Sequence, residues 1–269
     1  MDKTFKDVID GLHNGTEYLS HSALREFQKS PLHFMQYKLR QKEQTPSMAF
    51  GSLVHCLVLE PDQFEERYCF IPDDAPKKPS ITQLNAKKPS EDTVKAIQWW
   101  ASFQEQNKGK EIVSKSDQEK ASLIRDAIYK NESSKFVFDQ ITKTEIGIKW
   151  ENQGFKFRGF VDGSGDGIVC DLKIMADASP RKVERAILYD GYDQQAAHYT
   201  KGGGVKGDYY LVAADHIGHV SVFKIGQNTI NAAWEQISFT MNYFKKCLIL
   251  NDWDKSYDFF APNSGIFEI

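Results

Sequence analysis

The sequence predicts an α/β or α+β fold in which helices cover the faces of a β-sheet. Three segments with alternating hydrophobicity, at 144–151, 155–162 and 167–174, are joined by short glycine-containing links that suit hairpins. A helical segment, two further strands and a long helix over 227–250 follow them. This order indicates that the second half of the chain builds one sheet and packs helices against it.

The region at 1–140 is predicted to be mainly helical. Ser20 or Ser22 can cap the start of a short helix, and the pair Ser30-Pro31 is typical of the start of the next one. The run SMAFGSLVHCLVLEP, at 47–61, is too continuously apolar for a surface helix, so we expect a buried helix there.

The stretch at about 73–92 is rich in Pro, Lys and Ser, and we expect a mobile surface loop or an insertion there. Two polar helices are predicted after it, around 92–108 and 116–131. A single helix is predicted from about 180 to 199, with Ser179 as its N-cap.

The chain has 269 residues, of which 41% are hydrophobic and 26% charged, as is ordinary for a globular protein. We expect one domain over 1–269, with the sheet and its helices over 141–250. Neither a signal peptide nor an apolar run approaching roughly 20 residues is visible, so we expect a cytoplasmic protein with no membrane association. The four cysteines form no CxxC pair, which argues against a zinc ribbon or an iron–sulfur cluster.

The net charge of −3 is not the global footprint of a nucleic-acid binder. Such a function would depend on local basic patches and on bound cations, which offset acidic groups. The candidate basic residues are Lys38, Arg40, Lys42, Lys173, Arg181, Lys182 and Arg185. Solvated helix faces explain any one of them equally well.

The strand GIVCDLKI, at 167–174, carries an acid and a lysine where a buried strand should be apolar. Alternation puts Asp171 and Lys173 on the same face, and a short hairpin can bring the carboxylate of Asp162 beside Asp171. Two close carboxylates repel each other, and a hard divalent cation such as Mg²⁺ relieves that repulsion. A lysine beside the cation can orient or deprotonate a water, or neutralise charge that develops on a phosphate. A surface ion pair is the competing explanation of the acid-x-lysine pattern alone.

Two further groups of residues fit such a site. Gln195 and Tyr199 are four apart on one helical face, where Gln195 could hold the lysine or a phosphate and Tyr199 could stack on a base or hydrogen-bond the backbone. Packing of both against the sheet competes with these roles. His55 lies in the most apolar helix, where it is either a core histidine or the imidazole that completes a metal site with two carboxylates.

The motifs GSLVHCLVLEP, FRGFVD, CDLK and QQAAHY occur in this order along the chain. The ordered set resembles the PD-(D/E)xK nuclease superfamily in its RecB-like branch, and is most similar to the RecE-like (exonuclease VIII) nucleases of phages and prophages. The G-[ST]-x-x-H-x-x-V-L-E-P helix of that family is matched from Gly51 to Pro61, and an early helix ends in Ser30-Pro31 as it does there. The resemblance covers roughly 18–250 and implies a restriction-endonuclease-like core, with a mixed central sheet flanked by helices.

The resemblance implies an ATP-independent 5′→3′ exodeoxyribonuclease that requires Mg²⁺, for which Mn²⁺ can substitute. Such an enzyme degrades one strand of linear double-stranded DNA from an end and leaves a 3′ single strand for a RecT-like single-strand annealing protein. It also implies a toroidal homo-oligomer, trimeric or tetrameric, that encircles DNA in the cytoplasm of a bacterial host cell.

The family's functional residues carry over onto matching positions of this sequence. The metal ligands implied are His55, Asp162, Asp171 and the backbone carbonyl of Leu172; the catalytic lysine is Lys173, and Gln195 and Tyr199 are its supporting pair. Glu145 falls where relatives often carry a strand acid, and is either a contact of a second metal or an exposed strand residue. Arg25, Ser20 and Ser22 are candidates for contacts near the 5′ phosphate, with helix capping as the competing role of the serines.

Two other functions compete with the exonuclease. A non-catalytic DNA-end-binding recombination protein could use the same fold, but such proteins usually lose an aspartate or the lysine, and Asp162, Asp171 and Lys173 are all present. A PD-(D/E)xK endonuclease would cut closed circular DNA, which an end-dependent exonuclease leaves intact.

Overall fold

The computed structural model describes residues 4–40 and 44–260, and its chain divides into two compact units. Unit 1 comprises Met1–Thr45 and Ala127–Ile269, and unit 2 comprises Pro46–Asp126. The predicted sheet and the helices before and after it belong to unit 1. The predicted buried helix and the polar stretch that follows it belong to unit 2.

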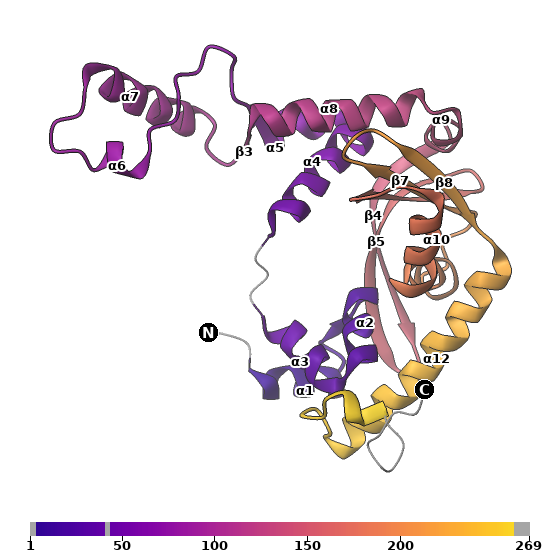
Figure 1. Cartoon of the computed structure of the whole chain (residues 1–269). Helices are drawn as coiled ribbons and strands as arrows, with labels where there is room; N and C mark the ends of the chain where they lie inside the picture. Colours follow the sequence, from indigo (N-terminus) through magenta and orange to yellow (C-terminus); the bar gives the residue numbers. More distant parts are fainter. Residues whose placement is uncertain (1–3, 41–43, 261–269) are drawn as a thin grey trace. The chain divides into compact units, whose positions relative to one another are not determined.

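Unit 1 is organised around a six-stranded mixed sheet in the order β1-β5-β6-β7-β8, with β4 paired to β5 (Figure 1). The strands are β1 (Tyr18–Leu19), β4 (Ile141–Asn152), β5 (Phe155–Gly165), β6 (Ile168–Met175), β7 (Asp208–Asp215) and β8 (Val220–Ile225). Pairs β4–β5, β5–β6 and β7–β8 are antiparallel, whereas β6–β7 and β1–β5 are parallel. The predicted α/β class with a mixed sheet and a helical N-terminal region is confirmed.

Strand β5 is paired along the whole of one edge but only at the two ends of the opposite edge. Along the fully paired edge its neighbour is β4. Along the opposite edge of β5, β1 pairs with Lys156 and Phe157, and β6 pairs only from Gly163 onward. In the described ladders, residues 158–161 therefore have no strand beside them on that edge, and the sheet opens there.

Helices pack around this sheet in unit 1. They are α1 (Phe5–His13), α2 (His21–Lys29), α3 (Pro31–Leu39), α9 (Glu132–Phe138), α10 (Pro180–Tyr189), α11 (Tyr192–Ala197), the π-helical turn η2 (His198–Gly202), α12 (Gln227–Leu250) and η3 (Tyr257–Phe260). The hydroxyl of Ser20 accepts a hydrogen bond from the backbone N–H of Ala23, and that of Ser30 from His33, so both predicted caps are confirmed, with Ser20 rather than Ser22 as the first.

An aromatic core joins the N-terminal helices to the last long helix. The ring of Phe27 on α2 lies 4.9 Å from that of Phe244 on α12, and Phe34 on α3 lies 5.6 Å from Trp253. All four side chains are almost completely buried. Burying such rings contributes about 2 kcal/mol or more each, so this cluster fixes α2, whose first turn borders the candidate site, against the sheet.

The single helix predicted over 180–199 is wrong. The chain leaves α10 at Asp190 and starts α11 after Gly191, whose φ is +81°. Ser179 occupies the N-cap position of α10, as predicted, but its side chain makes no capping hydrogen bond, and its N–H donates to the Asp177 carboxylate. Only glycine adopts such a φ without a steric penalty, so the break frees α11 to turn toward the sheet.

Replacing Gly191 with alanine is expected to lower the free energy of unfolding by about 2–4 kcal/mol, because a Cβ would stand 2.7 Å from Arg25 Cδ in addition to the φ penalty. Gly154→Ala is the matched control, since Gly154 has φ +86° and no described atom within 4 Å of its Cβ position. That control should cost only about 1 kcal/mol in urea unfolding. Equal losses would contradict a role for the Arg25 contact.

Unit 2 is built from helices and one small sheet. Its elements are α4 (Pro46–Leu59), η1 (Pro61–Gln63), α5 (Phe64–Arg67), β2 (Tyr68–Phe70), α6 (Ile81–Leu84), α7 (Glu91–Gln106), β3 (Glu111–Val113) and most of α8 (Lys115–Lys130), with β2 and β3 parallel. The prediction of a buried helix holds only for the second half of α4, from Leu53 to Leu59, because its first turn is exposed. Both predicted polar helices are confirmed. The polar stretch at 73–92 contains the one-turn helix α6. No helix in the described part of the chain is long and apolar enough to cross a membrane.

Candidate active site

The hairpin between β5 and β6 positions the first acid of the site. Asp162 lies near the end of β5, and its Oδ2 accepts a hydrogen bond of 2.7 Å from the backbone N–H of Leu172. The side chain thus bonds to β6 just beyond the last regular backbone pair, Gly163 with Cys170. The predicted approach of Asp162 to the second strand is confirmed.

Asp171 and Lys173 form an ion pair on one face of β6, as alternation predicts. Lys173 Nζ lies 2.6 Å from Asp171 Oδ2, and the side chains are 22% and 1% exposed. Burial raises the pKa of Asp171, an effect that Lys173 opposes and Asp162 reinforces. Burial acts to lower the pKa of Lys173, but the carboxylates of Asp171 and Asp162 outweigh it and raise that pKa. Lys173 is therefore a fixed cation here, which favours orienting water and neutralising charge over acting as a base.

The Gln195 amide binds Asp171 and not Lys173, which corrects that part of the prediction, whereas its contact with a phosphate stays a prediction. Its Nε2 donates to Asp171 Oδ1 over 2.5 Å, and it lies 3.4 Å from the hydroxyl of Tyr199. Tyr199 is 8% exposed and its ring packs over Gly159 on β5, where a Cβ would stand 2.6 Å from the ring. Tyr199 also lines the cavity, and the predicted stacking of its ring on a base stays a prediction.

Glu145 on β4 is half-buried beside Asp162, so the interpretation as an exposed strand residue is wrong. A carboxylate oxygen of Glu145 lies within 4.8 Å of one of Asp162. Its φ of +48° is unusual for a non-glycine residue within a strand. Strained backbone of this kind concentrates at functional sites, and here it turns a second acid toward the first.

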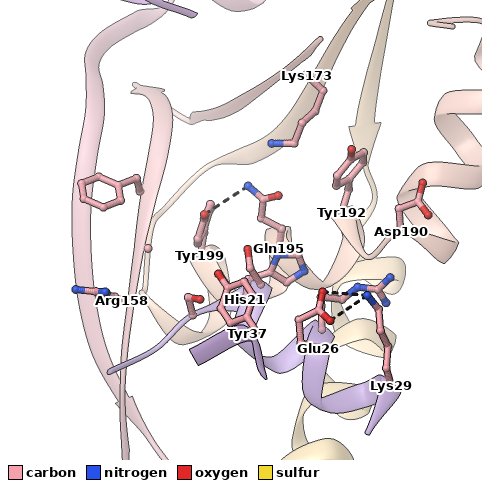
Figure 2. A pocket seen from close by; sticks show the side chains of 15 residues that line it. His21, Glu26, Lys29, Tyr37, Arg158, Lys173, Asp190, Tyr192, Gln195 and Tyr199 are labelled. Carbon is pink, nitrogen blue, oxygen red and sulfur yellow. Dashed lines mark hydrogen bonds and ion pairs between the residues drawn. The ribbon is translucent and has the colours of Figure 1, made fainter. Parts of the chain in front are cut away.

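Lys173, Gln195 and Tyr199 line an open cavity of about 820 Å³ in unit 1 (Figure 2). It occupies the opening in the sheet beside residues 158–161 of β5. Its lining comprises Ser20, His21, Ser22, Arg25, Glu26, Lys29, Tyr37, Arg158, Gly159, Phe160, Lys173, Asp190, Tyr192, Gln195 and Tyr199. The sequence-predicted lysine, its helical partners and the N-terminal serines and arginine thus line one space.

Tyr192 is a member of this lining that the sequence interpretation missed. Lys173 Nζ lies 5.4 Å from the centre of the Tyr192 ring, within range of a cation–π interaction. The signal was present in the sequence, because Tyr192 precedes Gln195 by three residues and so shares its helical face.

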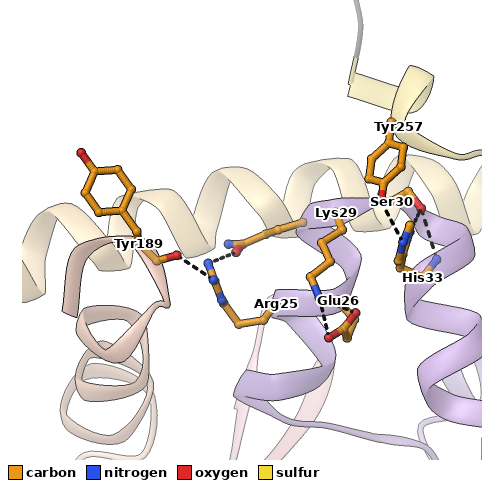
Figure 3. A network of polar contacts seen from close by, with 8 residues as sticks. Arg25, Glu26, Lys29, Ser30, His33, Tyr189 and Tyr257 are labelled. Atoms are coloured by element: carbon orange, nitrogen blue, oxygen red, sulfur yellow. Dashed lines mark hydrogen bonds and ion pairs between the residues drawn. The ribbon is translucent and has the colours of Figure 1, made fainter. Parts of the chain in front are cut away.

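The first turn of α2 supplies the other wall of the cavity. Arg25 donates to the Tyr189 carbonyl over 2.9 Å and lies 3.3 Å from Gln28 Oε1, which fixes its guanidinium between α2 and the end of α10 (Figure 3). Ser20 is occupied in capping α2, whereas Ser22 is exposed at the rim. Of the three candidates for contacts near the 5′ phosphate, Arg25 and Ser22 therefore keep polar atoms on the cavity side.

Only some of the predicted basic residues are exposed to solvent. Lys38 is largely buried in an ion pair with Glu17 and donates to the Tyr18 carbonyl, so it does not face solvent. Arg181, Lys182 and Arg185 are exposed on α10, and the Arg40 guanidinium lies over the Tyr37 ring. Lys42 lies outside the described residues.

His55 lies on α4 of unit 2 and is half-buried. The Leu172 side chain is fully buried, and the backbone of Leu172 pairs with Val212 of β7. The roles of His55 and of the Leu172 carbonyl as metal ligands stay predictions.

For the DNA cleavage that the sequence resemblance implies, replacing Gln195 with leucine is expected to lower kcat by about tenfold or more and to change KM little, because a hydrogen bond to a charged group is worth about 1.5–3 kcal/mol. The change leaves Asp171 without the amide that orients it. Gln194→Leu is the matched control, since the neighbouring amide bonds Gln28 and Gln236 outside the cavity. The control should lose thermal stability but keep kcat; equal losses of kcat would remove the role assigned to Gln195.

The mixed sheet, with an aspartate at a β-hairpin and an Asp-x-Lys motif on the next strand, defines a PDDEXK-like protein. The chain belongs to the family described as "PDDEXK-like domain of unknown function (DUF3799)", whose model matches residues 20–256. None of the curated proteins matches the sequence.

One solved structure has the same fold. The chain is similar to the crystal structure of a "Putative exonuclease" from Eubacterium rectale, with a TM-score of 0.56 and 16% identity over 92% of this chain and 87% of that chain. A second structure, described as SSO0001, has a TM-score of 0.28 and 15% identity over 71% of this chain and 86% of that chain, which is too low to bear on the fold.

Proposed function

We propose that this protein is a RecE-like, ATP-independent exodeoxyribonuclease that degrades one strand of linear double-stranded DNA in the 5′→3′ direction. The observation that carries the proposal is the pair of aspartates at the β5–β6 hairpin, Asp162 and Asp171. Asp171 contacts Lys173 and Gln195, and these two side chains line an open cavity of about 820 Å³. A surface ion pair would not require a buried aspartate held from two sides. The similarity to a structure described as an exonuclease supports the same reaction class.

The donor set fits a hard divalent cation. Asp162 and Glu145 bring two carboxylates within 4.8 Å, and Asp171 adds a third on the next strand. Asp171 Oδ2 is buried and accepts no hydrogen bond of regular geometry from the described residues, although Lys173 is close. Carboxylate ligands of this number and charge suit Mg²⁺ or Mn²⁺. When bound, such a cation offsets the carboxylate charges and polarises the phosphodiester.

The residues of the chain position the carboxylates, orient the attacking water and stabilise the charge that develops on the phosphate. Leu172 N–H and the Gln195 amide fix Asp162 and Asp171, so little reorganisation is needed when substrate arrives. The Lys173 ammonium orients the attacking water and stabilises negative charge on the phosphorus centre as the P–O bond to the leaving oxygen breaks. By resemblance, His55 and the Leu172 carbonyl complete the metal ligands, and Arg25 and Ser22 contact the DNA near its 5′ phosphate. Ser20, the third candidate for this contact, caps α2 instead.

The proposed biological setting follows from the same resemblance. The substrate is a double-stranded DNA end, and the product is a 3′ single-stranded tail that a RecT-like annealing protein binds. A toroidal homo-oligomer, trimer or tetramer, would keep the enzyme on one DNA molecule through many cycles, which a net charge of −3 permits if basic residues line the channel.

The proposal is tested with one linear duplex labelled separately at its 5′ and 3′ ends, incubated with Mg²⁺ or with a chelator, beside a closed circular duplex. Early Mg²⁺-dependent release of the 5′ label with the circle intact is the expected result. A cut circle would identify an endonuclease instead. Tight end binding without cleavage under Mg²⁺ or Mn²⁺ would identify a non-catalytic DNA-end-binding protein.

A further inference from the structure

The face of β4 and β5 that points away from the core carries an ordered set of side chains beside the acids. Alternation along β5 places Arg158, Phe160 and Asp162 on this face, while Phe157 and Val161 are buried on the other. On β4, Lys149 pairs with Arg158 and Gly147 with Phe160. We call Lys149, Arg158 and Phe160 the β4–β5 track.

Phe160 is 61% exposed although it lies in the middle of a paired strand. Its ring lies 3.4 Å from the position that a Cβ of Gly147 would occupy. Because glycine stands opposite, the ring rests close to the β4 backbone while most of its surface stays open to solvent. A large aromatic side chain held in this way offers a flat surface for stacking.

Lys149 and Arg158 are directly opposite each other and both are exposed. Like charges opposite one another in a sheet are destabilising. Within the described residues neither forms an ion pair with an acid; Lys149 Nζ lies 5.4 Å from the Tyr18 ring. Lys156 adds a third cation one step further along β5, with Glu151 across from it. The three cations outnumber the one acid among these four side chains, and this net positive charge favours an anionic ligand.

The track is continuous with the candidate active site. Arg158 and Phe160 line the same cavity as Lys173, and Figure 2 shows Arg158 on the opposite side of that cavity from Tyr192 and Asp190. Along β5, successive side chains of one face are about 6.8 Å apart, so Phe160 stands one step from Asp162 and Arg158 two steps. A ligand on the track would therefore lead to the acids.

We propose that the β4–β5 track binds a single-stranded segment of DNA, with a base stacked on Phe160 and phosphates against Lys149 and Arg158. The ring can stack only on an unpaired base, and stacking of this kind tolerates any sequence. The proposal deepens the proposed nuclease function and rests on it for the choice of DNA. The strand that binds the track is the one that has separated from the duplex near the cleavage point.

The test measures binding of a fluorescent single-stranded oligothymidylate to the full chain in a chelator, so that cleavage plays no part. Phe160→Leu is expected to weaken binding about tenfold, and Phe160→Trp to restore it. On binding, the added tryptophan should lose fluorescence beyond the change seen in the unmodified protein. Arg158→Gln should reduce the slope of log K against log salt by about 0.7, as expected for one lost phosphate contact.

Phe239→Leu is the matched control, because Phe239 on α12 is 63% exposed and lies outside the cavity lining. Unchanged binding by Phe160→Leu, or an equal loss in both variants, would overturn the proposal, as would equal competition by blunt duplex DNA. The nuclease proposal is judged separately. The unmodified protein could cleave no DNA with Mg²⁺ while Phe160→Leu still weakens oligothymidylate binding. That result would support the β4–β5 track as a binding site and refute the nuclease function.

Discussion

Lys173→Ala is expected to lower DNA cleavage by at least about a hundredfold, the loss typical when one preorganised group that stabilises transition-state charge is removed. The ammonium is held 2.6 Å from Asp171 and reaches the cavity with 22% of its side chain exposed. Removing it takes away both the cation that orients water and the charge that opposes the developing negative phosphate. The measurement is the rate of 5′ label release from linear duplex DNA in Mg²⁺.

The fold should survive this change, because burial already raises the pKa of Asp171 and a protonated carboxyl can stay bonded to Gln195. DNA binding in a chelator and the cooperativity of thermal unfolding check this, with Lys173→Gln as a second, less disruptive variant. Lys224→Ala is the matched control, since Lys224 pairs with Asp208 on the solvent side of the same sheet. Near-normal cleavage by Lys173→Ala would refute its catalytic role.

Asp162→Asn is expected to abolish stabilisation of the protein by Mg²⁺. In the unmodified protein, Mg²⁺ at about 100 times its dissociation constant should add about 2.7 kcal/mol and raise Tm by roughly 5–10 °C. The asparagine can still accept the Leu172 N–H bond through its own oxygen, so the hairpin is preserved. Without metal, the variant should be at least as stable, because one of the mutually repelling carboxylates beside Glu145 and Asp171 is gone.

Thermal unfolding with and without Mg²⁺ measures this effect independently of cleavage. Asp166→Asn provides the control, because Asp166 is an exposed residue of the hairpin turn between β5 and β6. Its Mg²⁺-induced shift in Tm should equal that of the unmodified protein. A full shift in Asp162→Asn would exclude Asp162 as a metal ligand.

Several features of the site were predictable from the sequence because they depend on neighbouring residues. The two-residue period of a strand puts Asp171 and Lys173 on one face whatever surrounds the strand, and the structure has them paired. The short glycine-containing turn likewise brings β6 back alongside β5, where Leu172 N–H reaches the Asp162 carboxylate. The caps at Ser20 and Ser30 follow from the chemistry of a hydroxyl before a helix.

Other features were not predictable because they depend on groups far apart in the sequence. Gln195 bonds an aspartate 24 residues away, and its partner depends on the direction of α11. That direction depends on the break at Gly191, where Arg25 fills the space that a side chain would need. The residues at 180–199 by themselves contain no sign of this contact with Arg25. The backbone of Glu145 at φ +48° is equally invisible in the letters TEIGIKW.

The sequence by itself therefore determined which residues are available and which face of its own element each one occupies. The tertiary structure alone decided which of these faces meet. The short strand β1 and the late pairing of β6 leave the edge of β5 open at 158–161, and the cavity lies in that opening. The physical reason is that hydrophobic periodicity and capping are local, whereas the register of distant strands and the packing of helices on them depend on the whole core.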